Sequence, residues 1–157
     1  TPFTIFCAIA LLEFFTYTAA FYLLFWGFDY FHESVQVSNH LNILLGLLIL
    51  AFFGLCLGAT TAVLAQKYPF VDAIVTATNR ALFFISGVFF YANELPKDLR
   101  DVLLLNPIFH VLEYIRAGLF TAYEARYADN WYVLSWLLGM LLLALATDRL
   151  GRRMVTT

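Results

Sequence analysis

The sequence predicts an all-α membrane protein with four transmembrane helices and a re-entrant helical hairpin. Of its 157 residues, 62% are hydrophobic and only 13% are charged, and the mean hydropathy is +0.80. Soluble domains are usually only about 45–50% apolar. The chain has room for a few spans of about 20 residues each, but not for a soluble catalytic domain beside them. Residues 1–157 are therefore expected to form a single transmembrane domain.

Apolar runs of spanning length occur at four places along the chain. The third run is the least apolar, because its first half carries polar side chains, and such a span is expected to turn its polar face toward protein or water. Aromatic residues typical of membrane interfaces follow the first run and open the last one. The predicted spans cover residues 3–28, 41–65, 70–91 and 131–147.

The distribution of Lys and Arg predicts the orientation of these spans. Four crossings place both termini on one side of the membrane, and the C-terminal tail carries Arg149, Arg152 and Arg153, whereas the loop at residues 29–40 has no Lys or Arg. Short segments rich in Lys and Arg remain in the cytoplasm. We therefore expect a multi-pass protein with both termini cytoplasmic.

The segment between the third and last spans predicts two short helices. Residues 97–105 place charges and leucines on opposite faces, as in an interfacial helix. Asn106 is a favourable N-cap and Pro107 a favourable first helical residue. A helix over residues 107–120 would be about 21 Å long, too short for a hydrocarbon layer of about 30 Å. We therefore expect a re-entrant hairpin over residues 93–120 on the non-cytoplasmic side, a feature that indicates a translocation path.

Composition also limits the classes of partner. The net charge of −2 leaves no basic surface for nucleic-acid phosphates, so no nucleic-acid partner is expected. Cys7 and Cys56 lie far apart in apolar runs, and the sequence has no Cys/His cluster with metal-ligand spacing, so no metal site is expected. The sequence begins at Thr1 without a signal-peptide pattern, and we expect the natural N-terminus to lie further upstream.

The most informative motifs lie in residues 85–120, which read ISGVFFYANELPKDLRDVLLLNPIFHVLEYIRAGLF. This run closely resembles the signature region of the membrane subunits of type-2 ABC exporters. The Leu-Glu-aromatic pattern of the first span and the turn at Tyr68-Pro69 are most similar to the permeases that export capsular polysaccharide in Gram-negative bacteria. The matching residues are Ser86 to Phe89, Leu95-Pro96, Asn106-Pro107, His110, Glu113 and Arg116.

The resemblance implies a fold and a function beyond what the composition establishes. Family members have six spans after a cytosolic amphipathic helix that docks on the ATPase, so this chain matches the C-terminal part and roughly a hundred residues of the pattern would precede it. The chain departs from many relatives after Phe89, where they have a proline and this chain has Phe90-Tyr91. The implied protein is not an enzyme but a permease subunit of the bacterial inner membrane.

The resemblance also implies cargo and partners. The subunit would form a homodimer with two ABC ATPase subunits and move lipid-linked capsular polysaccharide through a conduit between the two copies. Membrane lipids and periplasmic or outer-membrane export proteins would be further partners. The chain has no GxxxxGK[ST] phosphate-binding loop, so no cofactor is expected on it, and ATP and Mg²⁺ are expected on the partner ATPase.

Two helical stripes are candidate walls of such a conduit. Their residues are three or four apart and so share one side of a helix. Aromatic rings can bind the apolar faces of sugars, whereas ordinary packing or lipid contact is the alternative for aromatic residues in membranes. The stripe of the first span is Phe14, Tyr17, Phe21, Phe25 and Phe28, and that of the third is Asp72, Thr76, Asn79, Arg80, Phe83, Gly87 and Tyr91.

Glu13 and Arg80 are the charges furthest inside the predicted spans, at similar depth. An intramembrane charge costs at least about 2.5 kcal/mol and therefore requires a partner or water. One interpretation is an ion pair that locks the first and third spans together. The other places Arg80 on the conduit wall, where it attracts an anionic polymer or a lipid phosphate.

The remaining candidates are a packing motif and a gate. Gly54 and Gly58 form a GxxxG motif, which predicts close helix packing within the subunit. The predicted re-entrant gate contains Asn106, Pro107, His110, Glu113 and Arg116, of which Glu113 and Arg116 can pair. Too few ligands and no nucleophile accompany the His and Glu, so we predict no catalytic residue.

Three rival functions remain open at this point. A type-2 exporter of another cargo, such as O-antigen, teichoic acid, a lipid or a drug, has the same architecture. An intramembrane sugar transferase would need carboxylates or histidines that converge at one interface, whereas this sequence scatters its charges. The third rival is a membrane scaffold without transport activity.

Overall fold

The computed structural model describes residues 2–31, 37–68 and 70–155. Within these ranges every regular element is a helix. In chain order the elements are α1 (Pro2–Phe31), α2 (His40–Lys67), α3 (Phe70–Ile85), the 3₁₀ helix η1 (Ala92–Glu94), α4 (Lys97–Leu103), α5 (Pro107–Leu119) and α6 (Asn130–Val155). The prediction of an all-α fold is confirmed for the described residues.

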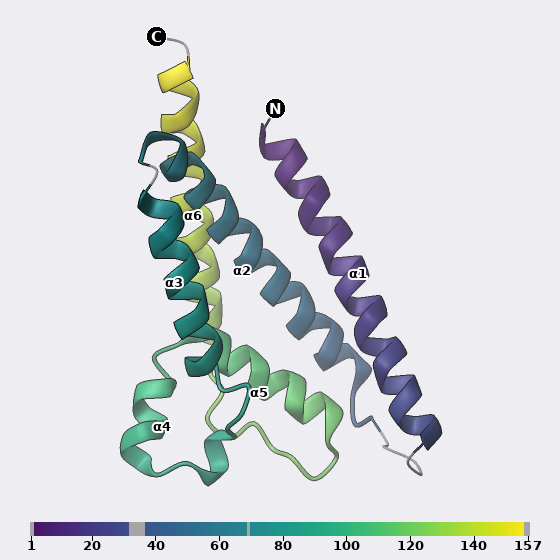
Figure 1. The fold of residues 1–157 in the computed structure, drawn as a ribbon. Helices are drawn as coiled ribbons and strands as arrows, with labels where there is room; N and C mark the ends of the chain where they lie inside the picture. Colours follow the sequence, from purple (N-terminus) through teal and green to yellow (C-terminus); the bar gives the residue numbers. More distant parts are fainter. Residues whose placement is uncertain (1, 32–36, 69, 156–157) are drawn as a thin grey trace.

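The long helices run back and forth between two ends of the molecule (Figure 1). Both chain ends lie at one end, and α4 and α5 lie at the opposite end, below the end of α3 (Figure 1). Helix α2 is central, since α1, α3, α5 and α6 all pack on it. The two candidate regions, the α3 face and the α4–α5 pair, are thus arranged around one long apolar helix.

Three helices are long and apolar enough to cross a membrane. The qualifying stretches are Cys7–Gly27 in α1, His40–Gln66 in α2 and Asn130–Gly151 in α6, and the count rises to four if α4 and α5 together make one broken span. With 16 residues, α3 is about 24 Å long, shorter than a hydrocarbon layer of about 30 Å. The described helices therefore make three or four candidate spans.

Helix α3 ends earlier than the predicted third span over residues 70–91. The helix stops at Ile85, and Gly87 follows with a φ of +79°. That left-handed backbone conformation cannot continue a right-handed helix and is readily adopted only by glycine. Gly87 and Tyr91 therefore lie in the connection after α3 and not on the helix face to which their spacing assigned them.

Helices α4 and α5 meet at a sharp bend of 104°. The predicted cap is confirmed: the Asn106 side chain accepts a hydrogen bond of 3.0 Å from the Ile108 amide, and Pro107 occupies the first turn of α5. The cap satisfies one of the amides that a helix start leaves without a partner, while proline has no amide to satisfy. Asn106-Pro107 therefore starts α5 in a new direction.

Helix α5 lies against the N-terminal half of α2 through small residues. The Gly118 carbonyl accepts a hydrogen bond of 2.9 Å from the Asn39 amide, and a Cβ at Gly118 would lie 2.9 Å from the Asn39 oxygen. Gly46 of α2 likewise has the Ile115 side chain directly over its Cα. Missing side chains allow the two backbones to approach closely.

The close helix contact predicted at Gly54 and Gly58 is not found in the described structure. Apart from the adjacent residues and the backbone of α2 itself, no described atom lies within 4 Å of the position that a Cβ would occupy at either glycine. Both glycines instead face a cavity between α1 and α2. Besides Gly87, the described glycines at close contacts are Gly46, Gly118 and Gly151, where a Cβ would lie 2.9 Å from Val63.

Gly87→Ala is expected to destabilise the protein. A Cβ at this position meets the ring of Phe109, and alanine pays the strain of the left-handed conformation, so we expect a loss of about 2 kcal/mol or more in the free energy of unfolding. Denaturant or thermal unfolding of the purified protein measures it. The control is Gly139→Ala in α6, which has open space around it and is expected to be neutral or slightly stabilising. Equal stability of the two variants would contradict the expectation.

Candidate functional site

Glu113 is the centre of a polar cluster at the end of the molecule opposite the chain ends. Its side chain is fully buried. Oε1 accepts a hydrogen bond of 2.7 Å from Arg116 Nη1 and one of 3.4 Å from the Ala92 amide, while Oε2 accepts one from the Tyr123 hydroxyl. A buried carboxylate is stable only when such donors replace water. One carboxylate thus joins η1, α5 and the loop after α5.

Arg116 extends the cluster to the connection after α3. Its Nη2 donates a hydrogen bond to the Gly87 carbonyl, and its guanidinium lies over the Tyr91 ring, 5.4 Å from the ring centroid. The planar guanidinium has several donors in fixed directions, so it can bind the carboxylate and the carbonyl together. Arg116 therefore holds both ends of the connection between α3 and η1.

Tyr123 is the member of this cluster that sequence reasoning missed. Burial, its hydrogen bond to Glu113 and the nearby negative charge raise the pKa of the Tyr123 hydroxyl above its ordinary value. The hydroxyl therefore remains protonated and continues to donate to Glu113 at neutral pH. Tyr123 lies in the loop after α5, outside the motif and without helical periodicity, so no sequence signal linked it to Glu113.

His110 connects three backbone segments. Its Nε2 lies 2.8 Å from the Leu104 carbonyl, and its Nδ1 accepts a hydrogen bond of 3.0 Å from the Asp129 amide. Because a carbonyl can only accept and an amide can only donate, the proton of the neutral ring lies on Nε2. With both ring nitrogens bonded to the backbone, His110 fastens the end of α4 and the start of α6 to α5.

The candidate conduit residues of α3 are exposed. Relative to the described chain, no residue of α3 is buried. Thr76, Asn79, Arg80 and Phe83 line a shallow hollow on the surface of this helix. Beyond the helix, Gly87 is buried and Tyr91 is 44% exposed. The predicted polar and aromatic face is thus limited to the residues of α3, and no other described helix covers it.

The aromatic stripe of α1 is only partly covered. Phe14, Phe21 and Phe25 are half-buried, whereas Tyr17 is exposed, and the side chain of Phe28 lies outside the described residues. The rings of Phe21 and Phe25 stack with centroids 6.5 Å apart. The stripe therefore combines packing against the protein with exposed aromatic surface, and its role as a conduit wall stays a prediction.

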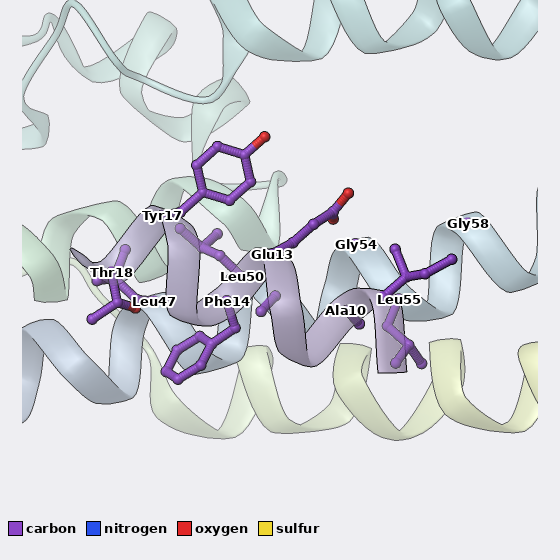
Figure 2. A pocket seen from close by; sticks show the side chains of 12 residues that line it. Ala10, Glu13, Phe14, Tyr17, Thr18, Leu47, Leu50, Gly54, Leu55 and Gly58 are labelled. Atoms are coloured by element: carbon purple, nitrogen blue, oxygen red, sulfur yellow. The ribbon is translucent and has the colours of Figure 1, made fainter. Parts of the chain in front are cut away.

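Glu13 lines a cavity of about 480 Å³ between α1 and α2, together with Tyr17, Gly54 and Gly58. Glu13 and Tyr17 project to the same side of α1 (Figure 2). The predicted ion pair between Glu13 and Arg80 is absent from the described structure, since neither side chain reaches the other. The reason is the arrangement of the helices, because α1 and α3 pack on α2 and share at most a slight contact.

The chain matches the ABC-2 type transporter family over residues 1–120. It belongs to this family. The predicted resemblance to type-2 ABC exporters is thereby confirmed, and the family is one of transporters and not of enzymes. The matched region includes α1 to α5 and therefore both the α3 face and the Glu113 cluster.

Three relatives of this ABC-2 transporter chain are named for the export or transport of capsule polysaccharide or polysialic acid. The capsule polysaccharide export inner-membrane protein CtrC of Neisseria meningitidis serogroup A is 33% identical over 103 residues, which are 66% of this chain and 39% of CtrC. The polysialic acid transport protein KpsM of Escherichia coli is 28% identical over 142 residues, 90% of this chain and 55% of KpsM. The capsule polysaccharide export inner-membrane protein BexB of Haemophilus influenzae is 29% identical over 97 residues, 62% of this chain and 37% of BexB. The chain thus spans about half or less of the length of these relatives.

Glu113→Ala is expected to destabilise this ABC-2 transporter chain strongly. Loss of the carboxylate leaves Arg116 partly buried without its partner and leaves the Tyr123 hydroxyl without an acceptor, which costs about 3–5 kcal/mol. Unfolding of the purified protein measures the change. The control is Glu124→Ala, which breaks an exposed pair with Arg126 and is expected to cost at most about 1 kcal/mol. A Glu113→Ala variant as stable as the Glu124→Ala control would contradict the role of the cluster.

Proposed function

We propose that this chain is the transmembrane subunit of an ATP-driven exporter that moves capsular polysaccharide from the cytoplasm across the inner membrane. The observation that carries the proposal is the similarity to CtrC, KpsM and BexB, which are named for the export or transport of capsule polysaccharide or polysialic acid. Membership in the ABC-2 family supports the mode of transport, in which separate ATPase subunits hold ATP and Mg²⁺. The cargo in this proposal is a lipid-linked polysaccharide.

The proposed topology has four crossings, α1, α2, α3 and α6, with α4 and α5 as a re-entrant hairpin on the non-cytoplasmic side. Two observations support it: both chain ends lie at the end opposite α4 and α5 (Figure 1), and the two short helices meet at 104°. With 13 residues, α5 is about 20 Å long and too short to cross by itself. The Arg-rich C-terminal tail favours a cytoplasmic position for both termini.

The proposed conduit lies between the α3 helices of two copies of the chain. An exposed face with Asn79 and Arg80 is costly against lipid, and a second copy would enclose it. Arg80 would attract anionic groups of the polymer or of its lipid phosphate, while Phe83 would offer its ring face to sugars. Periplasmic and outer-membrane partners would then continue the path to the cell surface.

Deletion of the complete gene in the source bacterium tests the function. We expect capsular polysaccharide to disappear from the cell surface and to accumulate inside the cell, because synthesis continues without export. Reintroduction of the gene restores surface polysaccharide. Immunoblots of surface and cytoplasmic fractions measure both pools. If the capsule is unchanged while export of O-antigen, teichoic acid or another cargo fails, the proposed substrate is wrong and that other molecule is the cargo.

Arg80→Ala is expected to reduce export to a small fraction of the wild-type rate, because the only positive charge of the α3 face is lost. Arg80→Lys is expected to retain most export, since it keeps the charge. Surface polysaccharide measures transport, and copurification of the ATPase measures assembly. The control Arg126→Ala removes an exposed arginine far from α3 in sequence and is expected to export normally. Normal export by Arg80→Ala would exclude the conduit role.

A further inference from the structure

One face of α5 is fastened to the turn that follows α3. The face consists of Asn106, Phe109, Glu113 and Arg116, which are three or four residues apart and therefore lie on one side of the helix from its N-cap onward. The turn consists of residues 86–92 and includes Gly87, with its φ of +79°. Every residue of this α5 face contacts the turn.

Three of the four contacts are hydrogen bonds, and the fourth is a packing contact of an aromatic ring. Asn106 Nδ2 donates a hydrogen bond of 3.4 Å to the Ser86 hydroxyl, and the Phe109 ring lies directly against Gly87. Arg116 donates to the Gly87 carbonyl, and Glu113 accepts from the Ala92 amide at 3.4 Å. The turn is thus attached at its start, at Gly87 and at its end.

Helix α3 itself is less buried against the rest of the described chain than the turn that follows it. No residue of α3 is buried against the described chain, although it packs on α2. The opposite side of α5, in contrast, rests on α2 through Ile115 at Gly46 and Gly118 at Asn39. The C-terminal end of α3 is therefore attached to α5, through the hydrogen bonds and the Phe109 packing at the turn.

We propose that Glu113, Arg116 and Tyr123 are positioning residues that make the end of α3 and α5 move as one unit. The inference rests on the proposed function, in which α3 lines the conduit and α5 lies at its exit. A displacement of α3 during transport is then transmitted to α5 through the turn, and the exit opens in step with the conduit. Tyr123 contributes by holding the Glu113 carboxylate in the orientation that Arg116 and Ala92 require.

Tyr123→Phe is the sharpest test of the unit, because it removes a single oxygen and keeps the ring beside Tyr91. Loss of one hydrogen bond to a carboxylate corresponds to a roughly tenfold change in a local opening equilibrium. The matched control is Tyr127→Phe, which keeps the ring that lies 4.1 Å from the Arg100 guanidinium. Arg116→Lys and Arg126→Lys form a second matched pair, one arginine inside the cluster and one in an exposed ion pair.

The first measurement is amide hydrogen exchange of the complete transporter with its ATPase in lipid nanodiscs. We expect the peptide over residues 86–93 to exchange about tenfold faster in Tyr123→Phe than in the wild type, and also faster in Arg116→Lys. The two controls are expected to match the wild type. Unchanged exchange of this peptide in both cluster variants would overturn the inference.

The second measurement is the amount of polysaccharide exported per ATP hydrolysed. A merely structural role lowers the amount of folded protein but leaves this ratio unchanged, whereas loss of the moving unit lowers the ratio. We expect a lower ratio for Tyr123→Phe and a normal ratio for Tyr127→Phe. Faster exchange with a normal ratio would overturn the positioning role. If the wild-type protein exports no polysaccharide at all, the proposed function fails, while hydrogen exchange still decides whether the cluster holds the turn.

Discussion

The hydrogen bonds to the buried Glu113 carboxylate hold together the end of the molecule opposite the chain termini. Three donors from separate segments, Arg116, Tyr123 and the Ala92 amide, bind it in place of water. Each donor also restrains its own segment, because leaving any of them unpaired in the interior is costly. The same carboxylate also bears on the connection after α3, since Arg116 pairs with Glu113 through Nη1 and donates to the Gly87 carbonyl through Nη2.

Helix α2 provides the support for this arrangement. It accepts α5 closely, because Gly46 and Gly118 remove side chains from the contact, and it carries α1, α3 and α6 around it. The cluster therefore rests on a closely packed helix pair, α2 and α5, whereas α3 has an exposed polar face.

Four charged side chains of the described helices differ in whether a single copy of the chain supplies their partners. Glu113 and Arg116 neutralise each other inside the fold. Glu13 instead lines a cavity, and Arg80 lies on the exposed face of α3. Because a charge facing lipid is unfavourable, these two side chains mark the surfaces of this ABC-2 transporter chain that water, cargo or other membrane helices are expected to cover.

Local properties of the sequence were sufficient for much of this description. Apolar runs of spanning length identified α1, α2 and α6, and the capping chemistry of Asn106-Pro107 located the start of α5 within one residue. The motif containing Glu113 and Arg116 led to the candidate site. The positions of the other site residues depend on contacts between segments that are far apart in the sequence. Gly87 and Tyr91 do not lie on the predicted helix face, because Phe109 and Arg116 hold this segment in a turn. Tyr123 belongs to the site although it lies in a loop without any periodic pattern. Periodicity describes neighbours along one helix, whereas hydrogen bonds and packing between helices depend on how the helices are arranged in space.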